Sequence, residues 1–384
     1  MRHDTRPDLS LTLNLGHHLG HCLRQIRASL ALAVMLGVAA LLGACGGSSH
    51  HTPRTTFTVS KLVSDGTITA SNTDSHLQNA WGIAFNPNGF VWVANNGTST
   101  STLYDGNGVP QTLIVNIPPG SAGPAAPTGI VFNAGTDFTV TQGGVTGKSA
   151  FIFVGEAGTV SGWSPTVNPT NAVTAVDASA TGAIYKGAAL ATYAGNHYLY
   201  VADFHNRAIS VYDASFNLAA LPGNFTDPGL PADYTPFNVA ALGANIYVSY
   251  AQFTPPNDDE NQGAGLGIVS VFDTGGNFIK RLITGGKLNA PWGMALAPSD
   301  FPGFPSALLI GNFGDGAINA YQPDTGEWLG ALSDLDGKPL AIDGLWGIGF
   351  GNGLNQQPLT TLFFAAGPND EAHGLYGRID GKTE

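Results

Sequence analysis

The chain has almost no cysteine and little charge. Its only cysteines are Cys22 and Cys45, both near the N-terminus, so the rest of the chain can form neither a disulfide nor a thiolate metal site. Charged residues make up 11% of the composition, and the formal net charge is −12. Nucleic-acid binding depends on a basic surface. The composition therefore predicts a protein that does not bind nucleic acid.

Helical periodicity is also missing beyond residue 57, as are the signatures of several common catalytic sites. The sequence contains no Gly-x-Ser-x-Gly elbow, His-Glu-x-x-His pair, Cys-x-x-Cys pair or phosphate-binding loop. No catalytic residue can be named from it. These absences favour a binding protein over an enzyme of those classes.

What the sequence does contain is a repeated unit of short apolar strands. Six copies align on a small residue that precedes an apolar run, at Gly82, Gly129, Gly187, Asn238, Gly293 and Gly347. A spacing of roughly 50 residues, with several short strands in each copy, indicates a β-propeller. The predicted fold class is all-β, as a six-bladed β-propeller.

The two ends of the repeat array predict how the ring closes. Fourth strands fit residues 111–117, 171–176, 277–283 and 327–332, but the sixth copy ends near Asp380 without one. The segment Phe57–Val63 precedes the first copy and belongs to no copy. We expect it to complete the last blade, because closing the ring removes a free sheet edge that would otherwise promote aggregation.

The N-terminus has the pattern of an export signal. Ala28–Leu42 is an apolar run of roughly 15 residues, too short to span a membrane and suited to the core of a signal peptide. It leads into Leu42-Gly43-Ala44-Cys45, which resembles the bacterial lipobox and implies a lipid on Cys45. The alternative is an ordinary signal peptide.

This pattern predicts three segments: a lipoprotein signal peptide at 1–44, a flexible tether at 45–56 and the propeller at 57–380. The expected location is the bacterial cell envelope, as an outer-membrane lipoprotein that faces the periplasm or the exterior. Contact with the membrane would be through the lipid on Cys45 only.

Aromatic residues at the start of the copies indicate a ligand site. In a propeller, the loops that enter the first strand and leave the second share one face around the central channel. We expect this face to carry Trp81, Phe237, Trp292 and Trp346, whose rings can stack on a sugar or another flat ligand. The alternative is that these rings only wedge between blades.

The same face is predicted to carry oxygen ligands for a metal. Asn95, Glu156, Asp203 and Asn312 follow second strands and can supply the oxygen atoms that Ca²⁺ prefers. Asn and Asp at such positions also serve as turn residues that bond their own backbone. Both interpretations are open at this point.

Several segments resemble a known family. Over nearly all of 57–380, the chain resembles a family of uncharacterised exported bacterial NHL-like six-bladed β-propeller proteins, some of which carry a C-terminal Pro-Glu-Pro sorting anchor. The matching segments are 288–298, 309–316, 342–348 and 366–374, and residues 199–213 resemble the NHL repeat. The resemblance implies the fold and export but brings no activity.

Two functions follow as hypotheses. The first is a monomeric, lipid-anchored extracytoplasmic propeller that acts as a binding or scaffold module for a protein or glycan partner at the channel mouth. The alternative is a calcium-dependent, lactonase-like hydrolase or lyase that holds the ion in the central channel.

Overall fold

A computed structural model describes residues 54–255 and 259–383 of the chain. The chain divides into two units, Met1–Thr52 and Pro53–Glu384, and the second is described here. The predicted signal peptide, Cys45 and most of the tether lie outside the described residues. Within the described residues, no helix has the length and apolar character needed to cross a membrane.

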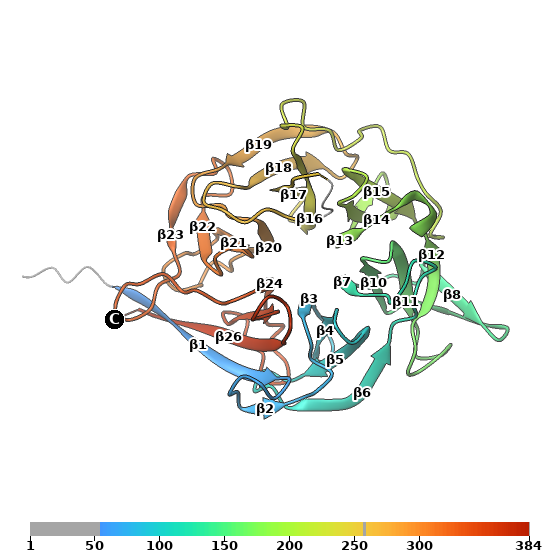
Figure 1. Cartoon of the computed structure of the whole chain (residues 1–384), viewed down its shortest axis with the longest axis horizontal. Coiled ribbons are helices and arrows are strands. Elements are labelled where there is room, and N and C mark those ends of the chain that lie inside the picture. Colours follow the sequence, from blue (N-terminus) through green and yellow to red (C-terminus); the bar gives the residue numbers. More distant parts are fainter. Residues whose placement is uncertain (1–53, 256–258, 384) are drawn as a thin grey trace, which may run out of the picture. The chain divides into compact units, whose positions relative to one another are not determined.

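Six sheets follow one another around a central axis, as the sequence predicts (Figure 1). The strands of each blade are given in order from the axis outward. The first blade contains β3 (Ala80–Phe85), β4 (Val91–Asn95), β5 (Thr100–Tyr104) and β6 (Pro110–Asn116), and the second contains β7 (Pro127–Phe132), β10 (Phe151–Gly155), β11 (Thr159–Trp163) and β12 (Val173–Asp177). The third contains β13 (Tyr185–Tyr193), β14 (Asn196–Asp203) and β15 (Ala208–Asp213).

The last three blades are built in the same way. The fourth contains β16 (Tyr234–Leu242), β17 (Asn245–Gln252), β18 (Ile268–Asp273) and β19 (Phe278–Thr284), and the fifth contains β20 (Pro291–Leu296), β21 (Leu308–Asn312), β22 (Ile318–Tyr321) and β23 (Trp328–Ala331). The sixth contains β24 (Leu345–Phe350), β25 (Leu362–Ala366), β26 (Leu375–Thr383) and β1 (Thr55–Ser64). A hairpin of β8 (Thr139–Gln142) and β9 (Val145–Lys148) is inserted in the second blade, and β2 (Asn72–Thr73) extends the sixth.

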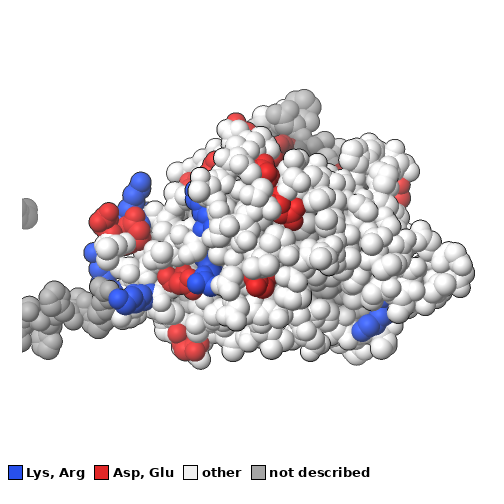
Figure 2. All heavy atoms as spheres, turned by 90° about the horizontal axis from the view of Figure 1, so that it is seen from below, with Lys and Arg blue, Asp and Glu red and all other residues white. Residues whose placement is uncertain are grey.

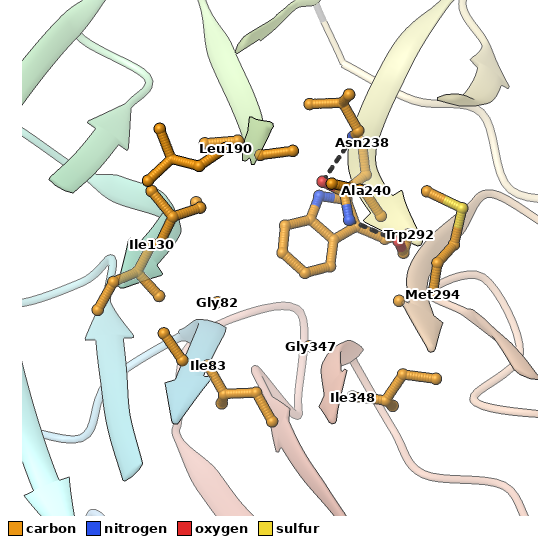
Figure 3. A pocket seen from close by; sticks show the side chains of 18 of the residues that line it. Gly82, Ile83, Ile130, Leu190, Asn238, Ala240, Trp292, Met294, Gly347 and Ile348 are labelled. Carbon is orange, nitrogen blue, oxygen red and sulfur yellow. Dashed lines mark hydrogen bonds between the residues drawn. The ribbon is translucent and has the colours of Figure 1, made fainter. Parts of the chain in front are cut away.

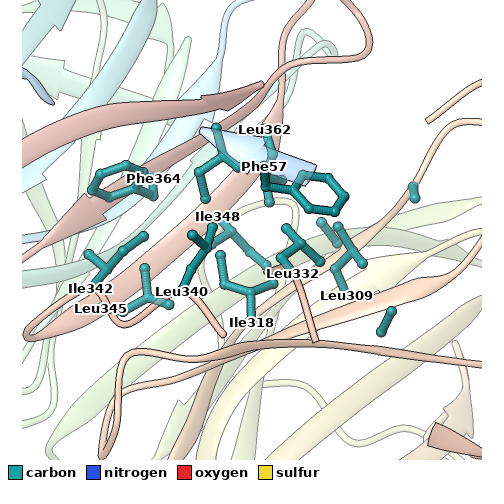
Figure 4. Packing of buried hydrophobic residues seen from close by; sticks show 14 of the residues in the cluster. Phe57, Leu309, Ile318, Leu332, Leu340, Ile342, Leu345, Ile348, Leu362 and Phe364 are labelled. Carbon is teal, nitrogen blue, oxygen red and sulfur yellow. The ribbon is translucent and has the colours of Figure 1, made fainter. Parts of the chain in front are cut away.

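The ring is closed by the N-terminal strand, which confirms the sequence prediction. Strand β1 pairs antiparallel with β26, with Val59 opposite Ile379, and becomes the fourth strand of the last blade. Phe57 is buried between the fifth and sixth blades, in a cluster that includes Leu332 and Leu362 (Figure 4). Closure therefore joins the two ends of the domain through both a strand ladder and an apolar core.

Fourth strands lie within two residues of their predicted starts in the first, second, fourth and fifth blades. The third blade has only three strands, followed by an isolated bridge between Tyr212 and Leu218. The segment after β15 contains Pro222, Pro228 and Pro231. Proline lacks the N–H that a strand ladder requires, so this segment cannot continue the sheet as a regular strand.

The small residue on which the copies align has a steric cause. A Cβ atom on Gly347 would lie 2.6 Å from the Trp81 carbonyl oxygen, and one on Gly293 would lie 2.6 Å from that of Trp346. The innermost strands of neighbouring blades are therefore too close for a side chain at this position. Asn238 is the exception, and its amide donates to the Trp292 carbonyl oxygen at 2.7 Å.

Candidate functional site at the channel mouth

A local irregularity recurs in all six innermost strands. The pairing between the first and second strands of each blade slips at the residues around the aligned small position, which marks a β-bulge. A bulge leaves a residue out of the ladder and re-aims its side chain. The residues that precede the small position are Trp81, Thr128, Lys186, Phe237, Trp292 and Trp346.

The four predicted aromatic residues meet one another at one end of the central channel. The Trp81 and Trp346 rings are stacked with their centroids 3.5 Å apart, and Trp292 contacts both rings edge-on. Phe237 also packs on Trp346. All four side chains are at most 5% exposed. The rings form an aromatic floor whose faces cover each other, and their stacking on a ligand stays a prediction.

Lys186 lies above this floor and was not singled out by the sequence as a site residue. Its Nζ atom lies 2.7 Å from Glu156 Oε1, 3.4 Å from Asp259 Oδ1 and 3.9 Å from Glu260 Oε2. The same atom lies 5.0 Å from the centroid of the Trp81 ring, which allows a cation–π contact. The side chain is 4% exposed. Burial lowers the pKa of Lys186, but the three carboxylates outweigh burial and raise the pKa above its ordinary value.

Glu371 approaches the same place from the sixth blade. Its Oε2 atom accepts a hydrogen bond of 2.8 Å from Asn79 Nδ2. Asn79 Nδ2 is also 3.3 Å from Asn96 Oδ1, and Asn96 Nδ2 donates to Glu156 Oε2 at 2.9 Å. Two asparagines thus connect Glu371 with the Glu156–Lys186 ion pair. These residues and Asp259 define the channel mouth.

The backbone that presents Glu371 is strained. Asn369, Asp370 and Glu371 have φ values of 59°, 50° and 64°, so three consecutive residues other than glycine adopt the left-handed conformation. Each such residue costs of order 1 kcal/mol and persists only where the surrounding structure enforces it. Strain of this kind is typical of residues held for function.

The carboxylates of the mouth differ in their protonation. Burial raises the pKa of Glu371 to about 7, with further increases from Glu156 and Asp259, although Lys186 and the Asn79 hydrogen bond lower it. Burial likewise raises the pKa of Glu260 well above its ordinary value. Burial opposes ionisation of Asp259 too, but its hydrogen bonds with Glu260 and Lys186 leave its pKa lowered. Neutral and ionised carboxyl groups therefore lie side by side.

Several buried polar atoms near the mouth have no hydrogen-bond partner. They are Asn79 Oδ1, Trp81 Nε1, Glu260 Oε2 and Trp346 Nε1. Buried polar groups are paired in most proteins, by protein atoms or by bound molecules. Unpaired atoms beside the channel mouth mark this region as one where a polar molecule can bind.

Of the four predicted calcium ligands, only Glu156 lies at the mouth. Asn95 bonds Thr100 and Thr102 inside its own blade. Asp203 accepts hydrogen bonds from Asn206, and Asn312 donates to Asp315 and to the Lys287 carbonyl oxygen. Across residues 54–255 and 259–383, no group of three or more His, Cys, Asp or Glu residues is placed to hold a metal ion. Asp203 thus has the turn role that the sequence left open, Asn95 and Asn312 donate hydrogen bonds to neighbouring groups, and calcium binding stays a prediction.

Two cavities adjoin the aromatic floor. The channel contains a cavity of about 320 Å³ lined by the innermost strands, with Ile130, Leu190, Met294 and Ile348 around it and Trp292 reaching into it (Figure 3). A cleft of about 270 Å³ lies between loops of the fifth and sixth blades and is lined by Phe313, Gly367 and three aspartates. The Phe313 ring stacks on Trp346, so this cleft borders the floor.

Comparison with known proteins gives the chain its family. The chain is 36% identical over 352 residues to the uncharacterized protein R648 of Acanthamoeba polyphaga mimivirus, covering 88% of this chain and 85% of that protein. It is 32% identical over 334 residues to the uncharacterized protein L690 of the same virus, covering 84% and 86%. The chain belongs to the family of these mimivirus proteins.

This finding corrects the resemblance proposed from the sequence. The relatives are uncharacterised viral proteins, so the expectation of an exported bacterial family is wrong. A strand, a tight turn and a small inner residue are required by the fold itself, so short segments with this pattern do not identify a family. No family model matches the chain.

Solved structures share the fold alone. A protein of unknown function from Bacteroides thetaiotaomicron aligns with a TM-score of 0.51 at 12% identity, over 86% of this chain and 77% of that one. A glucose dehydrogenase aligns with a TM-score of 0.50 at 13% identity, over 84% and 98%. At these identities the similarity establishes the architecture and carries no activity over.

Proposed function

We propose that the propeller is a ligand-binding module that takes a small, hydroxyl-rich group, such as a sugar unit of a glycan, at the channel mouth. The observation that carries the proposal is the convergence of polar side chains from five blades on one place. Asn79 and Asn96 come from the first blade, and Glu156, Lys186, Asp259 and Glu371 come from the second, third, fourth and sixth.

The chemistry of the mouth suits hydroxyl groups. Carboxylate and amide oxygens accept hydrogen bonds, while amide N–H and ammonium groups donate them. A hydroxyl group can therefore both donate its O–H and accept through its oxygen at the mouth. The aromatic floor beneath excludes water, which strengthens polar contacts above it. The adjoining cleft offers room for a neighbouring unit beside Phe313. A binding site typically combines such a concave shape with a few convergent polar groups.

A calcium-dependent hydrolase is supported less well. Lys186 Nζ already occupies the position between Glu156 and Asp259 in which a cation would neutralise them. A calcium ion requires six to eight oxygen ligands, and it would be repelled by a buried ammonium group beside it. Treating the purified protein with a calcium chelator is therefore expected to leave its melting temperature unchanged.

Binding at the mouth can be tested with the full-length protein in detergent and a panel of mono- and oligosaccharides. A ligand at a hundred times its dissociation constant stabilises the folded state by about 2.7 kcal/mol, which raises the melting temperature by several degrees. Asn96→Ala removes the amide that bridges the mouth and should abolish the shift. Glu327→Gln, an exposed change between β22 and β23, serves as the control.

A protein partner is the other outcome of this test. If no saccharide shifts the melting temperature, a glycan ligand at the mouth is refuted. Capture of a defined protein that is lost in Asn96→Ala and kept in Glu327→Gln would then reassign the mouth to protein binding.

The proposed setting of the module is a membrane surface reached through a lipid on Cys45. The support is the apolar run Ala28–Leu42 and the Leu-Gly-Ala-Cys sequence that follows it. A lipid chain adds about 0.8 kcal/mol of membrane affinity for each buried methylene group. The propeller itself contributes no apolar helix among the described residues.

A further inference from the structure

Resting on the binding function proposed above, we infer that the ligand at the channel mouth carries a protonated amine, as an amino sugar does, and that Glu371 with Asp259 receives it. The inference rests on an excess of carboxylates over cations at the mouth, on unpaired buried acceptors there, and on the acidic cleft that continues from it.

The excess of carboxylates can be counted from the contacts. Lys186 is the cation of the mouth, and it contacts the carboxyl groups of Glu156, Asp259 and Glu260. Glu371 adds a fourth carboxyl group, held by the neutral amide of Asn79. Burial raises the pKa of Glu260 well above its ordinary value, so this carboxyl group stays protonated, but one ammonium group still faces Glu156, Asp259 and Glu371. A second cation supplied by a ligand would add to this balance, because a carboxylate that is partly withdrawn from water is stabilised by an opposite charge beside it.

Acceptor atoms suited to an ammonium group are present. Glu260 Oε2 belongs to a side chain that is 3% exposed; it makes no hydrogen bond and has only the 3.9 Å contact with Lys186 Nζ. Asn79 Oδ1, in a residue that is 4% exposed, also has none. Glu371 uses Oε2 for Asn79, and its Oε1 atom takes no part in that hydrogen bond. An ammonium group offers three donors and no acceptor, so it matches a place that has acceptors left over.

The cleft beside the mouth has the same sign of charge. Its lining includes Asp315, Asp343 and Asp370 and no lysine or arginine. Asp370 directly precedes Glu371 in the strained turn, so cleft and mouth share a loop. The chain has 15 Lys and Arg residues against 27 Asp and Glu residues, and broad areas of the face shown in Figure 2 carry no charged group. A cationic ligand is therefore attracted along the cleft, whereas an anionic ligand is repelled.

The protonation of Glu371 gives this inference a second readout. Burial raises the pKa of Glu371 to about 7, and repulsion from Glu156 and Asp259 adds to the increase, while Lys186 opposes it. A bound ammonium group would favour the ionised carboxylate and lower this pKa. Binding must then release protons near neutral pH, and affinity must rise with pH as Glu371 ionises.

The experiment is isothermal titration of the full-length protein with glucosamine, its N-acetyl form and glucose. These three share a ring and differ in whether a charged amine is present. We expect glucosamine to bind at least about tenfold more tightly than the N-acetyl form, a difference of about 1.4 kcal/mol. We also expect its affinity to rise between pH 5.5 and 7, with proton release that is visible when buffers of different ionisation enthalpy are compared.

Matched variants separate a specific contact from general attraction. Glu371→Gln keeps the shape of the side chain and should remove the preference for the amine together with the proton release. Glu327→Gln removes the same charge between β22 and β23 and should change neither. Asp370→Asn tests the cleft and should weaken amine binding by a smaller factor. A preference for glucosamine that both glutamate variants reduce equally would overturn the inference in favour of nonspecific charge attraction.

Two other outcomes also decide the matter. If all three sugars bind equally and Asn96→Ala abolishes binding, the amine inference fails while the glycan-binding function stands. If none of the three binds and no other saccharide shifts the melting temperature, both fail together.

Discussion

The strongest test of the mouth geometry is the stability of Glu371→Gln as a function of pH. Glu371 ordinarily titrates near pH 4.5, and burial raises its pKa in the folded protein to about 7. Between these values the folded state binds a proton that the unfolded state has lost. The free energy of unfolding must therefore fall as pH rises from about 4.5 to 7, and the loss is complete above pH 7.

The magnitude follows from the size of the shift. One pKa unit corresponds to about 1.4 kcal/mol, so a shift of this size destabilises the wild-type protein by up to about 3 kcal/mol at alkaline pH. Glutamine keeps the oxygen that accepts from Asn79 Nδ2 and carries no charge at any pH. We expect Glu371→Gln to be nearly as stable as wild type at pH 5 and about 2 kcal/mol more stable at pH 8.

Urea unfolding of both proteins at pH 5, 6, 7 and 8 measures this difference, because the other titrating groups cancel between the two curves. For a domain of this size the expected gain at pH 8 is about 3 °C in melting temperature, from an unfolding entropy of about 0.7 kcal/mol/K. A gap that does not change with pH, or a variant less stable than wild type at pH 8, would refute the placement of Glu371 among like charges.

Four further predictions test other parts of the molecule. Lys186→Met leaves Glu156 and the buried Glu260 without their cation and should cost about 3–5 kcal/mol in urea unfolding at pH 8, but less at pH 5, where the raised pKa values keep Glu260 and Glu371 protonated. Deletion of residues 54–64 exposes the edge of β26 and should give aggregates in size-exclusion chromatography. Gly347→Ala should cost about 1–3 kcal/mol, because the new Cβ lies 2.6 Å from a carbonyl oxygen, whereas Gly349→Ala meets only side-chain atoms from 3.3 Å and should cost less. Cys45→Ser should remove the mass of a lipid from the intact protein and move the protein from the detergent phase to the aqueous phase on phase separation.

The architecture could be predicted from the sequence because close backbone contacts between neighbouring blades require a small residue at the same place in the repeat. The aligned small residue is required wherever the innermost strands of adjacent blades approach, as at Gly293 and Gly347. Short apolar runs such as Val91–Asn95 are buried along their whole length and are therefore apolar in every copy. The closing strand could be predicted because a segment with strand character was left over and one blade lacked a strand.

The site could be predicted only in part from the sequence, because a shift of one residue along a strand reverses the direction in which a side chain points. Successive strand residues face opposite sides. Asn95 ends β4 and bonds inside its blade, while Asn96 reaches Glu156 at the mouth. The pattern of Asn-Asn after a strand does not distinguish the two. The contact of Lys186 with Asp259 and Glu260 joins strand β13 of the third blade to a loop of the fourth, and nothing near either segment in the sequence indicates it.

A signal for Lys186 was nevertheless present in the alignment of the copies. Lys186 takes the place, before the small residue, that Trp81, Trp292 and Trp346 hold in other copies. The bulge at this place re-aims the side chain in every blade, so the fold delivers one residue from each blade to the channel end. Where most copies supply a ring, a charged residue at the same place is buried among rings and needs carboxylates to hold it. The loops after the second strands supply them, and they supply more than one lysine can neutralise. The floor is thus common to the repeat, whereas the charge of the mouth belongs to the loops, and it is in these loops that ligand specificity should be sought.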